Sequence, residues 1–245
     1  MDARNELKRK AAHRAVEFLE SGMVIGLGTG STAQFALERI AELLKTGELE
    51  NIIGIPTSNR TGNLARSMGI PLGALDDFDK IDVTIDGADE VDVDLNLIKG
   101  GGGALLREKI VAQASRRNII IIDDSKLSPA LGTIFPLPVE VIPFGLHAQI
   151  SYIESLGSKV TIRKTKSDES FITDQGNMIL DCKFDGIPNP SKLSLALDGR
   201  AGIVEHGLFI NLATDVIVAG EKETRHITRQ ADSKESKSST FEKSE

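Results

Sequence analysis

The sequence has a single cysteine, no long apolar run and no excess of positive charge, and each of these shortages excludes a class of protein. Cys182 alone among 245 residues cannot form an internal disulfide or a zinc site built from several cysteines. No segment approaches the roughly 20 apolar residues of a membrane-spanning helix, and the charged N-terminus, MDARNE, lacks the apolar region of a signal peptide. A formal net charge of −7 argues against non-specific binding to nucleic acid. We therefore expect a soluble, cytoplasmic protein that binds neither membranes nor nucleic acids.

Up to about residue 126, short apolar runs alternate with segments whose apolar residues recur at helical spacing. The runs occupy residues 23–28, 51–56, 81–86 and 118–123, and the helical spacing is found at residues 7–19, 31–44, 59–67 and 104–115. The run at 118–123 is the most continuous, which is typical of a strand covered on both faces. Strands that alternate with helices predict a mostly parallel sheet with helices on both sides. In such a sheet, ligands bind beyond the carboxyl ends of the strands.

The following part of the chain has short strand-like runs that lie closer together, at residues 137–143, 159–163 and 177–181, with one helical segment at 148–156. We therefore predict an α/β fold with a main domain of residues 1–130 and 206–224 and a smaller α+β domain of residues 131–205. Residues 225–245 are almost entirely polar and cannot bury enough surface to offset the entropy of ordering, which predicts a disordered tail.

The first motif with chemical meaning is GLGTGST at residues 26–32, directly after the first predicted strand. Small residues let backbone amides approach an anion at the start of a helix, where the helix dipole favours phosphate. The hydroxyls of Ser31 and Thr32 add donors. No lysine follows the glycines as in a Walker loop, and the spacing differs from the dinucleotide pattern G-x-G-x-x-G. The alternative interpretation is a tight strand-to-helix turn capped by a serine.

The second motif is DGADE at residues 86–90, which follows another predicted strand. Asp86 and Asp89 bracket two small residues that leave room for a ligand, and their carboxylates can bind sugar hydroxyls or move protons. One alternative is a solvated acidic turn. Another is a divalent metal site, since hard cations prefer oxygen ligands, although the run does not match the calcium-loop pattern.

The third motif is Lys99 followed by four glycines, with Glu108 in the helix that comes next. Consecutive glycines are costly to order, which indicates backbone that approaches a ligand or a strained turn. A lysine can stabilise a developing oxyanion, and a glutamate can act as a base where its geometry and pKa suit. The alternative for Glu108 is an ordinary surface glutamate beside Lys109.

Other polar residues give weaker signals. Lys8 lies on the polar side of the first predicted helix. The four histidines show no paired ligand spacing, so we expect them to be structural or exposed. Cys182 has no activating partner nearby in the sequence, which favours a structural role.

Taken in order, the motifs resemble those of the ribose-5-phosphate isomerase A family. The shared pattern runs through GTGST at residues 28–32, DGADE at 86–90, KGGG at 99–102, REK at 107–109, DSK at 124–126 and FPLPVEVIP at 135–143. The resemblance extends to about residue 220, and its departures are small: a leucine at position 27 and a fourth glycine at position 103. It implies a Rossmann-like sheet domain with the smaller domain as a lid, assembled into a homodimer or homotetramer. The implied reaction interconverts D-ribose 5-phosphate and D-ribulose 5-phosphate, in the non-oxidative branch of the pentose phosphate pathway.

Carried over by position, the resemblance makes Glu108 the general base and Asp86, Asp89 and Lys99 its partners in catalysis and substrate binding. It implies neither a metal nor a nucleotide cofactor. It also implies further contacts with the sugar phosphate from Lys8, Thr29, Gly30, Ser31, Thr32, Gly87, Ala88, Gly100, Gly101, Gly102 and Lys126. In the implied mechanism, Asp86 or Asp89 helps the sugar ring to open. Glu108 then moves a proton between C2 and C1, while Lys99 and glycine-loop amides stabilise an enediolate.

Two other classes of function stay open at the level of sequence. A sugar-phosphate-sensing regulatory domain can share such a fold, but it would usually carry a DNA-binding helix-turn-helix, for which there is no room before residue 20. The other class is a related enzyme, either a deaminase of amino-sugar phosphates or a coenzyme A transferase with a glutamate nucleophile. The combination of DGADE with KGGG argues against both enzymes.

Overall fold

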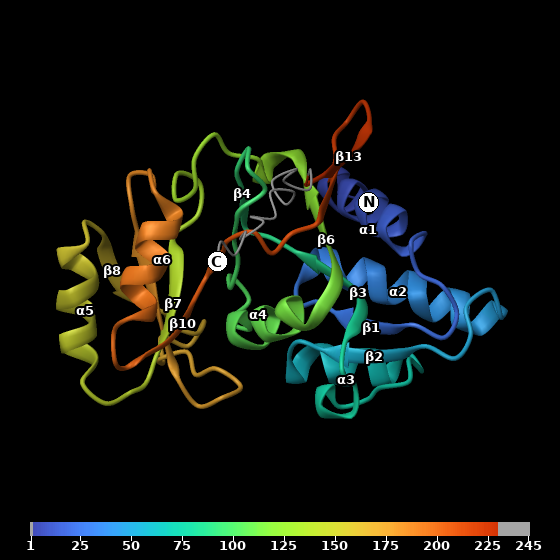
Figure 1. Ribbon diagram of the computed structural model, residues 1–245, viewed down its shortest axis with the longest axis horizontal. Helices are drawn as coiled ribbons and strands as arrows, with labels where there is room; N and C mark the ends of the chain where they lie inside the picture. The colour runs from blue at the N-terminus through green and yellow to red at the C-terminus, as the bar shows by residue number, and fades with distance from the viewer. Residues whose placement is uncertain (1, 230–245) are drawn as a thin grey trace, which may run out of the picture.

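The computed structural model describes residues 2–229, and its main feature is a six-stranded sheet in the order β13-β12-β6-β3-β1-β2 (Figure 1). Five of these strands are parallel, and β13 alone runs antiparallel to its neighbour. The strands are β1 (Val24–Leu27), β2 (Ile53–Pro56), β3 (Ile81–Gly87), β6 (Ser115–Asp123), β12 (Asp215–Ala219) and β13 (Thr224–Thr228). The predicted α/β class with a mostly parallel sheet is confirmed.

Helices cover both faces of this sheet, as the continuous apolar run in β6 predicted. Side chains alternate along a strand, so Ile119 and Ile121 belong to the core beneath α1 and α2, whereas Ile120 and Ile122 belong to the core on the opposite face. Figure 1 shows α1 and α2 on one side of the sheet and α4 on the other. The helices are α1 (Ala3–Val16), α2 (Ser31–Thr46), α3 (Asn59–Ser67) and α4 (Leu105–Ala114).

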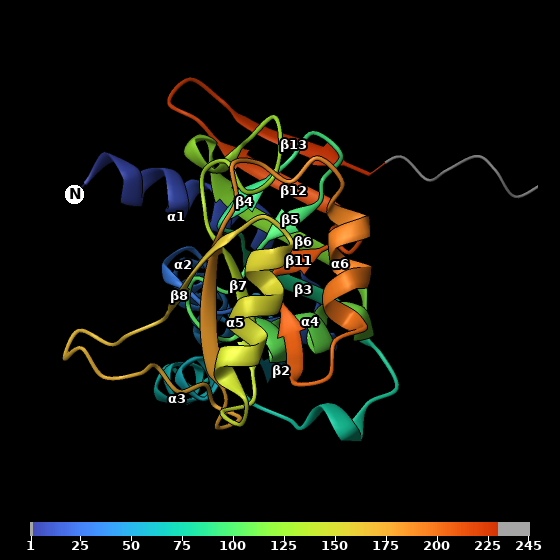
Figure 2. The same ribbon diagram turned by 90° about the vertical axis from the view of Figure 1, so that its left-hand side faces the viewer.

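A second sheet of four antiparallel strands, in the order β10-β7-β9-β8, has an apolar core of its own. Its strands are β7 (Leu137–Val141), β8 (Lys159–Ile162), β9 (Met178–Lys183) and β10 (Ile203–His206). Helices α5 (Leu146–Ser155) and α6 (Pro190–Asp198) cover the face that points away from the main sheet (Figure 2). Nearly all of this unit lies within the predicted smaller domain, but the division of the chain into two domains stays a prediction.

Helix α6 has no counterpart among the predicted elements, although the sequence does contain signals for its start. Asn189 accepts a hydrogen bond from the amide of Lys192 as an N-cap, and Pro190 occupies the first helical position. Both residues are typical of a helix start.

A small third sheet joins the other two and positions the ends of the functional motifs. It has the order β11-β5-β4 and consists of β4 (Glu90–Val91), β5 (Leu97–Ile98) and β11 (Leu208–Phe209). Asp89 directly precedes β4 and Lys99 directly follows β5. Because β4 and β5 pair antiparallel, both residues lie at the same end of this sheet. The remaining elements are two short 3-10 helices, η1 (Leu75–Asp77) and η2 (Asp124–Lys126).

The predicted polar tail begins too early in the chain. Residues 225–228 belong to β13, which pairs with β12 over five positions and satisfies the open edge of the sheet. Ile227 packs against the core, and His226 contacts the carboxylate of Asp215 at 2.6 Å. A polar composition is compatible with an edge strand because one of its faces can remain in water. The rest of the predicted tail, residues 230–245, lies outside the described residues.

Within residues 2–229, no helix combines the length and apolar character that crossing a membrane requires.

Candidate active site

The polar loops that follow three neighbouring parallel strands meet in one cleft. These strands are β1, β3 and β6, and the glycine loop before α4 lines the same cleft. The cavity has a volume of about 160 Å³, well below the roughly 300–1,000 Å³ of pockets for drug-sized ligands. A cavity of this size suits a small metabolite better than a dinucleotide.

All but one of the predicted site residues line this cavity. The lining includes Lys8, Thr29, Gly30, Ser31, Thr32, Gly87, Ala88, Asp89, Lys99, Gly100, Gly101, Gly102, Glu108 and Lys126. The exception is Asp86, whose side chain is 3% exposed and contacts the lining residue Lys99. The structure thus separates Asp86, which lies behind the cavity wall, from Asp89, which faces the cavity.

A buried cluster of one lysine and two carboxylates forms the floor of the site. The Nζ atom of Lys99 lies 3.0 Å from Oδ2 of Asp86 and 3.6 Å from Oε2 of Glu108, and all three side chains are at most 4% exposed. Lys99 also donates a hydrogen bond to the carbonyl of Gly87. The lysine therefore holds the two carboxylates and the DGADE loop together.

Burial sets the protonation of this cluster. It raises the pKa of Glu108 to about 8, because the desolvation of the carboxylate outweighs the attraction of Lys99 and because Asp86 and Asp89 add repulsion. Burial also raises the pKa of Asp86. Burial alone would lower the pKa of Lys99, but the charges of Asp86 and Glu108 outweigh it and raise that pKa. One lysine cannot balance two buried carboxylates, so the pair retains a proton near neutral pH.

Asp86 is held by backbone amides on the side away from Lys99. Its Oδ1 atom accepts hydrogen bonds from the amides of Thr29 at 3.1 Å and Gly87 at 2.7 Å. This arrangement requires a residue without a side chain at position 28, since a Cβ on Gly28 would lie 2.3 Å from Oδ1 of Asp86. The glycine motif after β1 thus serves partly to let Asp86 approach the backbone.

Glu108 has the burial and the free carboxylate oxygen that a general base needs to accept a proton from a substrate. It lies in the first turn of α4, and its Oε2 atom is buried without a hydrogen-bond partner among the described residues. A buried carboxylate oxygen that accepts no hydrogen bond is costly unless a ligand uses it. Nearby, Oδ2 of Asp89 accepts a hydrogen bond of 2.7 Å from the amide of Gly101. The predicted alternative for Glu108, an exposed helix glutamate, is wrong.

The other end of the cavity is cationic and rich in donors. Gly30 is the N-cap of α2, and no side chain among residues 2–229 caps this helix, so the interpretation of the motif as a serine-capped turn is wrong. The uncapped amides and the hydroxyls of Ser31 and Thr32 are available to an anion. Lys8 donates a hydrogen bond of 2.9 Å to Oγ of Ser31, and Lys126 lines the same cavity. These groups suit a phosphate.

The DGADE motif is not a solvated acidic turn. Asp86 and Glu90 are buried, and both oxygens of Glu90 accept hydrogen bonds from backbone amides between Gly132 and Phe135. Glu90 therefore anchors a neighbouring loop and does not line the cavity.

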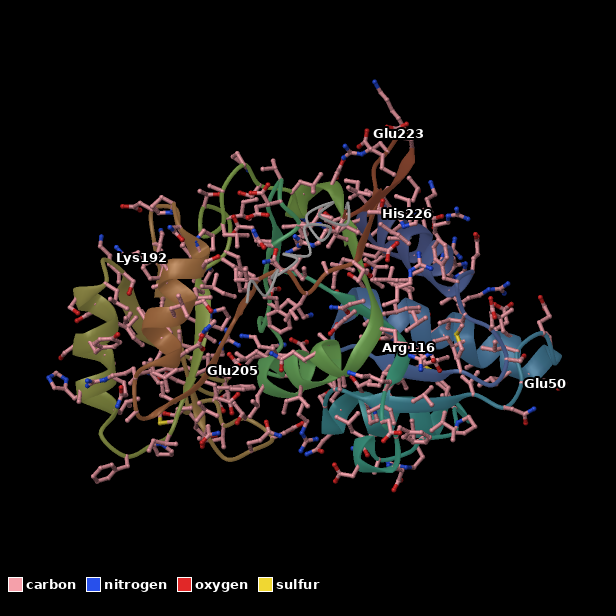
Figure 3. All side chains as sticks on the ribbon, in the orientation of Figure 1. Glu50, Arg116, Lys192, Glu205, Glu223 and His226 are labelled. Atoms are coloured by element: carbon pink, nitrogen blue, oxygen red, sulfur yellow. The ribbon has the colours of Figure 1, made fainter. Side chains whose placement is uncertain are left out.

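Within residues 2–229, the one group with three closely spaced candidate metal ligands is Asp198, Glu205 and His206, outside the cleft. The Nδ1 atom of His206 accepts a hydrogen bond from the amide of Leu208, so Nε2 carries the proton that faces Asp198 at 3.1 Å. Glu205, on β10 beside α4 in Figure 3, contacts Nζ of Lys109 at 2.5 Å. These groups satisfy one another, which suits a structural network better than a metal site.

Known proteins of one family are similar to this chain over most of its length. The sequence model of the family described as ribose 5-phosphate isomerase A (phosphoriboisomerase A) matches residues 53–223. The ribose-5-phosphate isomerase A of Desulfatibacillum aliphaticivorans is 58% identical over 220 residues, which are 90% of this chain and 96% of that protein. The chain belongs to the ribose 5-phosphate isomerase A family. The predicted family and the predicted enzyme class, an aldose–ketose isomerase, are confirmed.

Solved structures of this family share the whole fold. The ribose 5-phosphate isomerase of Plasmodium falciparum is 40% identical, with a TM-score of 0.89 over 93% of this chain and 100% of that one. A D-ribose-5-phosphate isomerase in complex with phospho-erythronic acid is 41% identical, with the same TM-score over 91% of this chain and 98% of that one.

Several residues near the cleft were not predicted from the sequence. Arg4 and Asp123 also line the cavity, and Arg4 donates a hydrogen bond of 2.8 Å to Oγ of Ser125. Asp123 ends β6, so the rule that ligands bind at the carboxyl ends of strands was a usable signal for it. Arg4 had no such signal, because only the packing of α1 brings it to the cleft. Behind the wall, Oγ1 of Thr29 contacts three hydroxyls, those of Thr57, Ser58 and Thr61, at 2.8–2.9 Å.

Proposed function

We propose that this cleft interconverts D-ribose 5-phosphate and D-ribulose 5-phosphate by moving one proton, and that Glu108 is the group that moves it. The observation that carries the proposal is the buried Oε2 atom of Glu108, which has no hydrogen-bond partner in the described part of the chain and lies 3.6 Å from Nζ of Lys99. A base with a pKa of about 8 is well matched to abstracting a carbon-bound proton near neutral pH. The adjacent ammonium group supplies positive charge where the substrate becomes an anion.

The reaction begins with the open-chain aldose. Glu108 removes the proton on C2, and the electron pair of that C–H bond forms the C1–C2 double bond while the carbonyl electrons move to O1. Lys99 and the glycine-loop amides stabilise the resulting enediolate without reorganisation. A proton then passes from the O2 hydroxyl to O1, and Glu108 returns its proton to C1, which gives the ketose. The same steps in reverse convert the ketose into the aldose.

Asp89 is the carboxylate that serves ring opening and the transfer between the oxygens. It lines the cavity, whereas Asp86 lies behind Lys99. Asp86 therefore acts as a positioning residue that fixes the ammonium group. The separation of the two aspartates in the structure supports this assignment, which sequence reasoning left open.

The cationic end of the cleft binds the phosphate of the substrate. Lys8, Lys126 and the uncapped amides of α2 provide charge and donors there. A related isomerase was solved with phospho-erythronic acid, a ligand that carries both a phosphate and a carboxylate. The two ends of this cleft offer matching groups, and the carboxylate corresponds to the two oxygens of an enediolate.

One assay tests the proposed reaction directly. The purified protein, supplied with ribose 5-phosphate in the presence of EDTA and with no added metal, is expected to form the ketose. Absence of ketose would refute the reaction, and a loss of activity that depends on EDTA would revive the metal hypothesis.

Replacing Lys8 by methionine is expected to raise KM for ribose 5-phosphate by about 10-fold or more while kcat changes far less. The lost interaction is a charge-assisted contact with the phosphate, worth about 1.5–3 kcal/mol, and it is equally present in the ground and transition states. Steady-state kinetics of the variant checks this result. Lys10, an exposed lysine on the same helix, provides the control, since Lys10→Met should keep the wild-type KM. A lower kcat with an unchanged KM for Lys8→Met would contradict the phosphate role.

The activity is expected to fall as the pH is lowered through about 8. Glu108 works as a base only when ionised, and burial raises the pKa of this carboxyl to about 8, so it becomes protonated at a higher pH than an ordinary glutamate. Log kcat/KM should therefore rise with a slope of about one per pH unit on the acid side and then level off. The phosphate of the substrate titrates near pH 6 and should give a separate, lower transition. A profile that stays flat from about pH 6.5 to 9 would contradict this assignment.

The homodimer or homotetramer that the resemblance implies and the cytoplasmic location that the composition predicts both stay predictions. Analytical ultracentrifugation of the full chain tests the first of them.

A further inference from the structure

Arg163 directly follows β8 of the smaller sheet and contacts the glycine loop of the active site, although it does not line the cavity. Its Nε and Nη2 atoms bind both carboxylate oxygens of Asp181 on β9, with the Nε bond at 3.0 Å. Its Nη1 atom donates to the carbonyls of Gly100 at 2.7 Å and Gly101 at 3.2 Å. The side chain is only 12% exposed. One guanidinium thus joins the smaller sheet to two consecutive peptide groups of the loop.

These two bonds fix the direction in which the loop amides point. In a trans peptide the carbonyl and the following N–H point in opposite directions across one rigid plane. Since Arg163 holds the carbonyl of Gly100, the amide of Gly101 points the other way, where it donates to Oδ2 of Asp89 at 2.7 Å. The carbonyl of Gly101 is held by the same atom, which orients the amide of Gly102 in the same manner. Glycine peptides lack the steric restraint that would otherwise keep them in one orientation.

A second contact from the same region holds the far end of the loop. Gly103 has a positive φ of 79°, and a Cβ at this position would lie 2.4 Å from the ring of Phe171. The guanidinium of Arg163 lies 5.9 Å from the centre of that ring. The loop is therefore bounded by an arginine and an aromatic ring from the smaller sheet and its connections.

We propose that Arg163 is a positioning residue for the isomerase reaction: it orients the peptides of Gly100–Gly102 so that their amides face Asp89 and the bound sugar. This inference rests on the proposed role of the glycine loop and of Asp89 in the reaction. The smaller sheet is then part of the active-site machinery, because a side chain that directly follows one of its strands holds two carbonyls of the loop, beside the bond of 2.9 Å from the amide of Gly103 to the carbonyl of Gly100. Asp181 acts one step further away, by holding the guanidinium.

The test is the kinetics of Arg163→Met beside a matched control. Arg117→Met is that control: Arg117 binds both oxygens of Asp215 at 2.9 and 2.7 Å and lies 4.2 Å from the ring centre of Phe18. It does not line the cleft, and within residues 2–229 its side chain makes no hydrogen bond to a residue that does. Loss of either arginine removes an ion pair in which two guanidinium nitrogens bind one aspartate, together with a contact between the guanidinium and an aromatic ring. We expect Arg163→Met to lower kcat/KM about 10-fold or more, chiefly through KM because substrate must then order the loop, and Arg117→Met to change it less than about 2-fold.

A double-mutant cycle with Asp89→Asn separates positioning from a general loss of stability. Arg163 orients the Gly101 amide that binds Asp89, so part of its effect passes through that carboxylate, and Arg163→Met should lower kcat/KM by a smaller factor in the Asp89→Asn background than in the wild type, whereas independent effects would add. Arg163→Lys should recover only part of the activity, since an ammonium cannot hold a carboxylate through two nitrogens and still reach both carbonyls. If Arg163→Met does not fold, Arg163→Lys and Asp181→Asn must each show a smaller rise in KM in the same direction.

A wild-type KM and kcat in folded Arg163 variants, or strict additivity with Asp89→Asn, would overturn the inference. Glu108→Gln measured in parallel distinguishes this outcome from a failure of the proposed function. Full turnover in Glu108→Gln would refute the role of the base while leaving the effect of Arg163 on KM in place. A normal KM for Arg163→Met together with an inactive Glu108→Gln would refute the positioning role alone.

Discussion

Replacing Glu108 by glutamine is expected to lower kcat by about 10²–10⁴-fold, the usual contribution of a positioned general base, with little change in KM. Glutamine keeps the size and shape of the side chain but cannot accept a proton from C2. The change also removes a buried negative charge beside Lys99 without adding volume, so the cavity should keep its shape. Steady-state kinetics in both directions, with ribose 5-phosphate and with ribulose 5-phosphate, measures the effect. Both directions should lose the same factor, because one group serves both proton transfers.

Glu140 provides a matched control for this substitution. It is also fully buried and also has one carboxylate oxygen without a partner in the described residues, but it lies on β7 and binds Thr173 and Asn177, away from the cleft. Glu140→Gln should therefore keep the wild-type kcat, whatever its effect on the melting temperature. If Glu108→Gln retained near-normal turnover, or if Glu140→Gln lost as much, the assignment of Glu108 as the base would fail.

The sequence predicted the elements that position the site because strong local signals define them. The apolar runs of β1, β3 and β6 and the polar motifs that follow them lie at the carboxyl ends of parallel strands, where a sheet of this kind binds ligands. Knowing that geometry in advance was enough to expect Ser31 and Asp89 in one cleft. The order of the strands was not predicted, yet the rule applies to any parallel sheet in which these strands are close.

What sequence reasoning missed depends on burial and on contacts between distant segments. DGADE contains two aspartates with the same local surroundings, and only the packed structure shows that Asp86 lies behind Lys99 while Asp89 faces the cavity. The raised pKa of Glu108 arises from desolvation, which no local pattern encodes. Arg163 is 63 residues from Gly100 along the chain, and its neighbours in the sequence give no sign of the contact.

The proposed reaction depends on a small number of electrostatic interactions in the buried cluster. Lys99 attracts two buried carboxylates, yet burial keeps the pKa of each carboxyl above its ordinary value. The cluster can therefore hold a proton and release it near neutral pH, with the lysine charged throughout. A cation that is fixed before the substrate binds needs no rearrangement when the enediolate forms, which is the condition for efficient electrostatic stabilisation.

Replacing Lys99 by methionine is the second large effect that we expect, and its pH dependence makes it distinctive. Loss of a preorganised oxyanion partner lowers kcat by about 10²–10³-fold. In addition, Asp86 and Glu108 lose the positive charge that lowers their pKa values, so both pKa values rise further and the acid limb of the profile moves to higher pH. Raising the pH should then recover the fraction of kcat that is lost because Glu108 is protonated. It should not recover the fraction that is lost because the enediolate is no longer stabilised.

Lys109 provides the control for this variant because it is also a buried lysine, next to Glu108 in the sequence. It contacts Glu205 at 2.5 Å and the carbonyl of His206 at 2.8 Å, outside the cleft. Lys109→Met should therefore keep the acid limb near its wild-type position, even if the melting temperature falls. Circular dichroism establishes that both variants are folded. Complete recovery of Lys99→Met at high pH would mean that the lysine only tunes Glu108, whereas a persistent deficit of about 10²-fold or more requires that its ammonium group stabilises the enediolate directly.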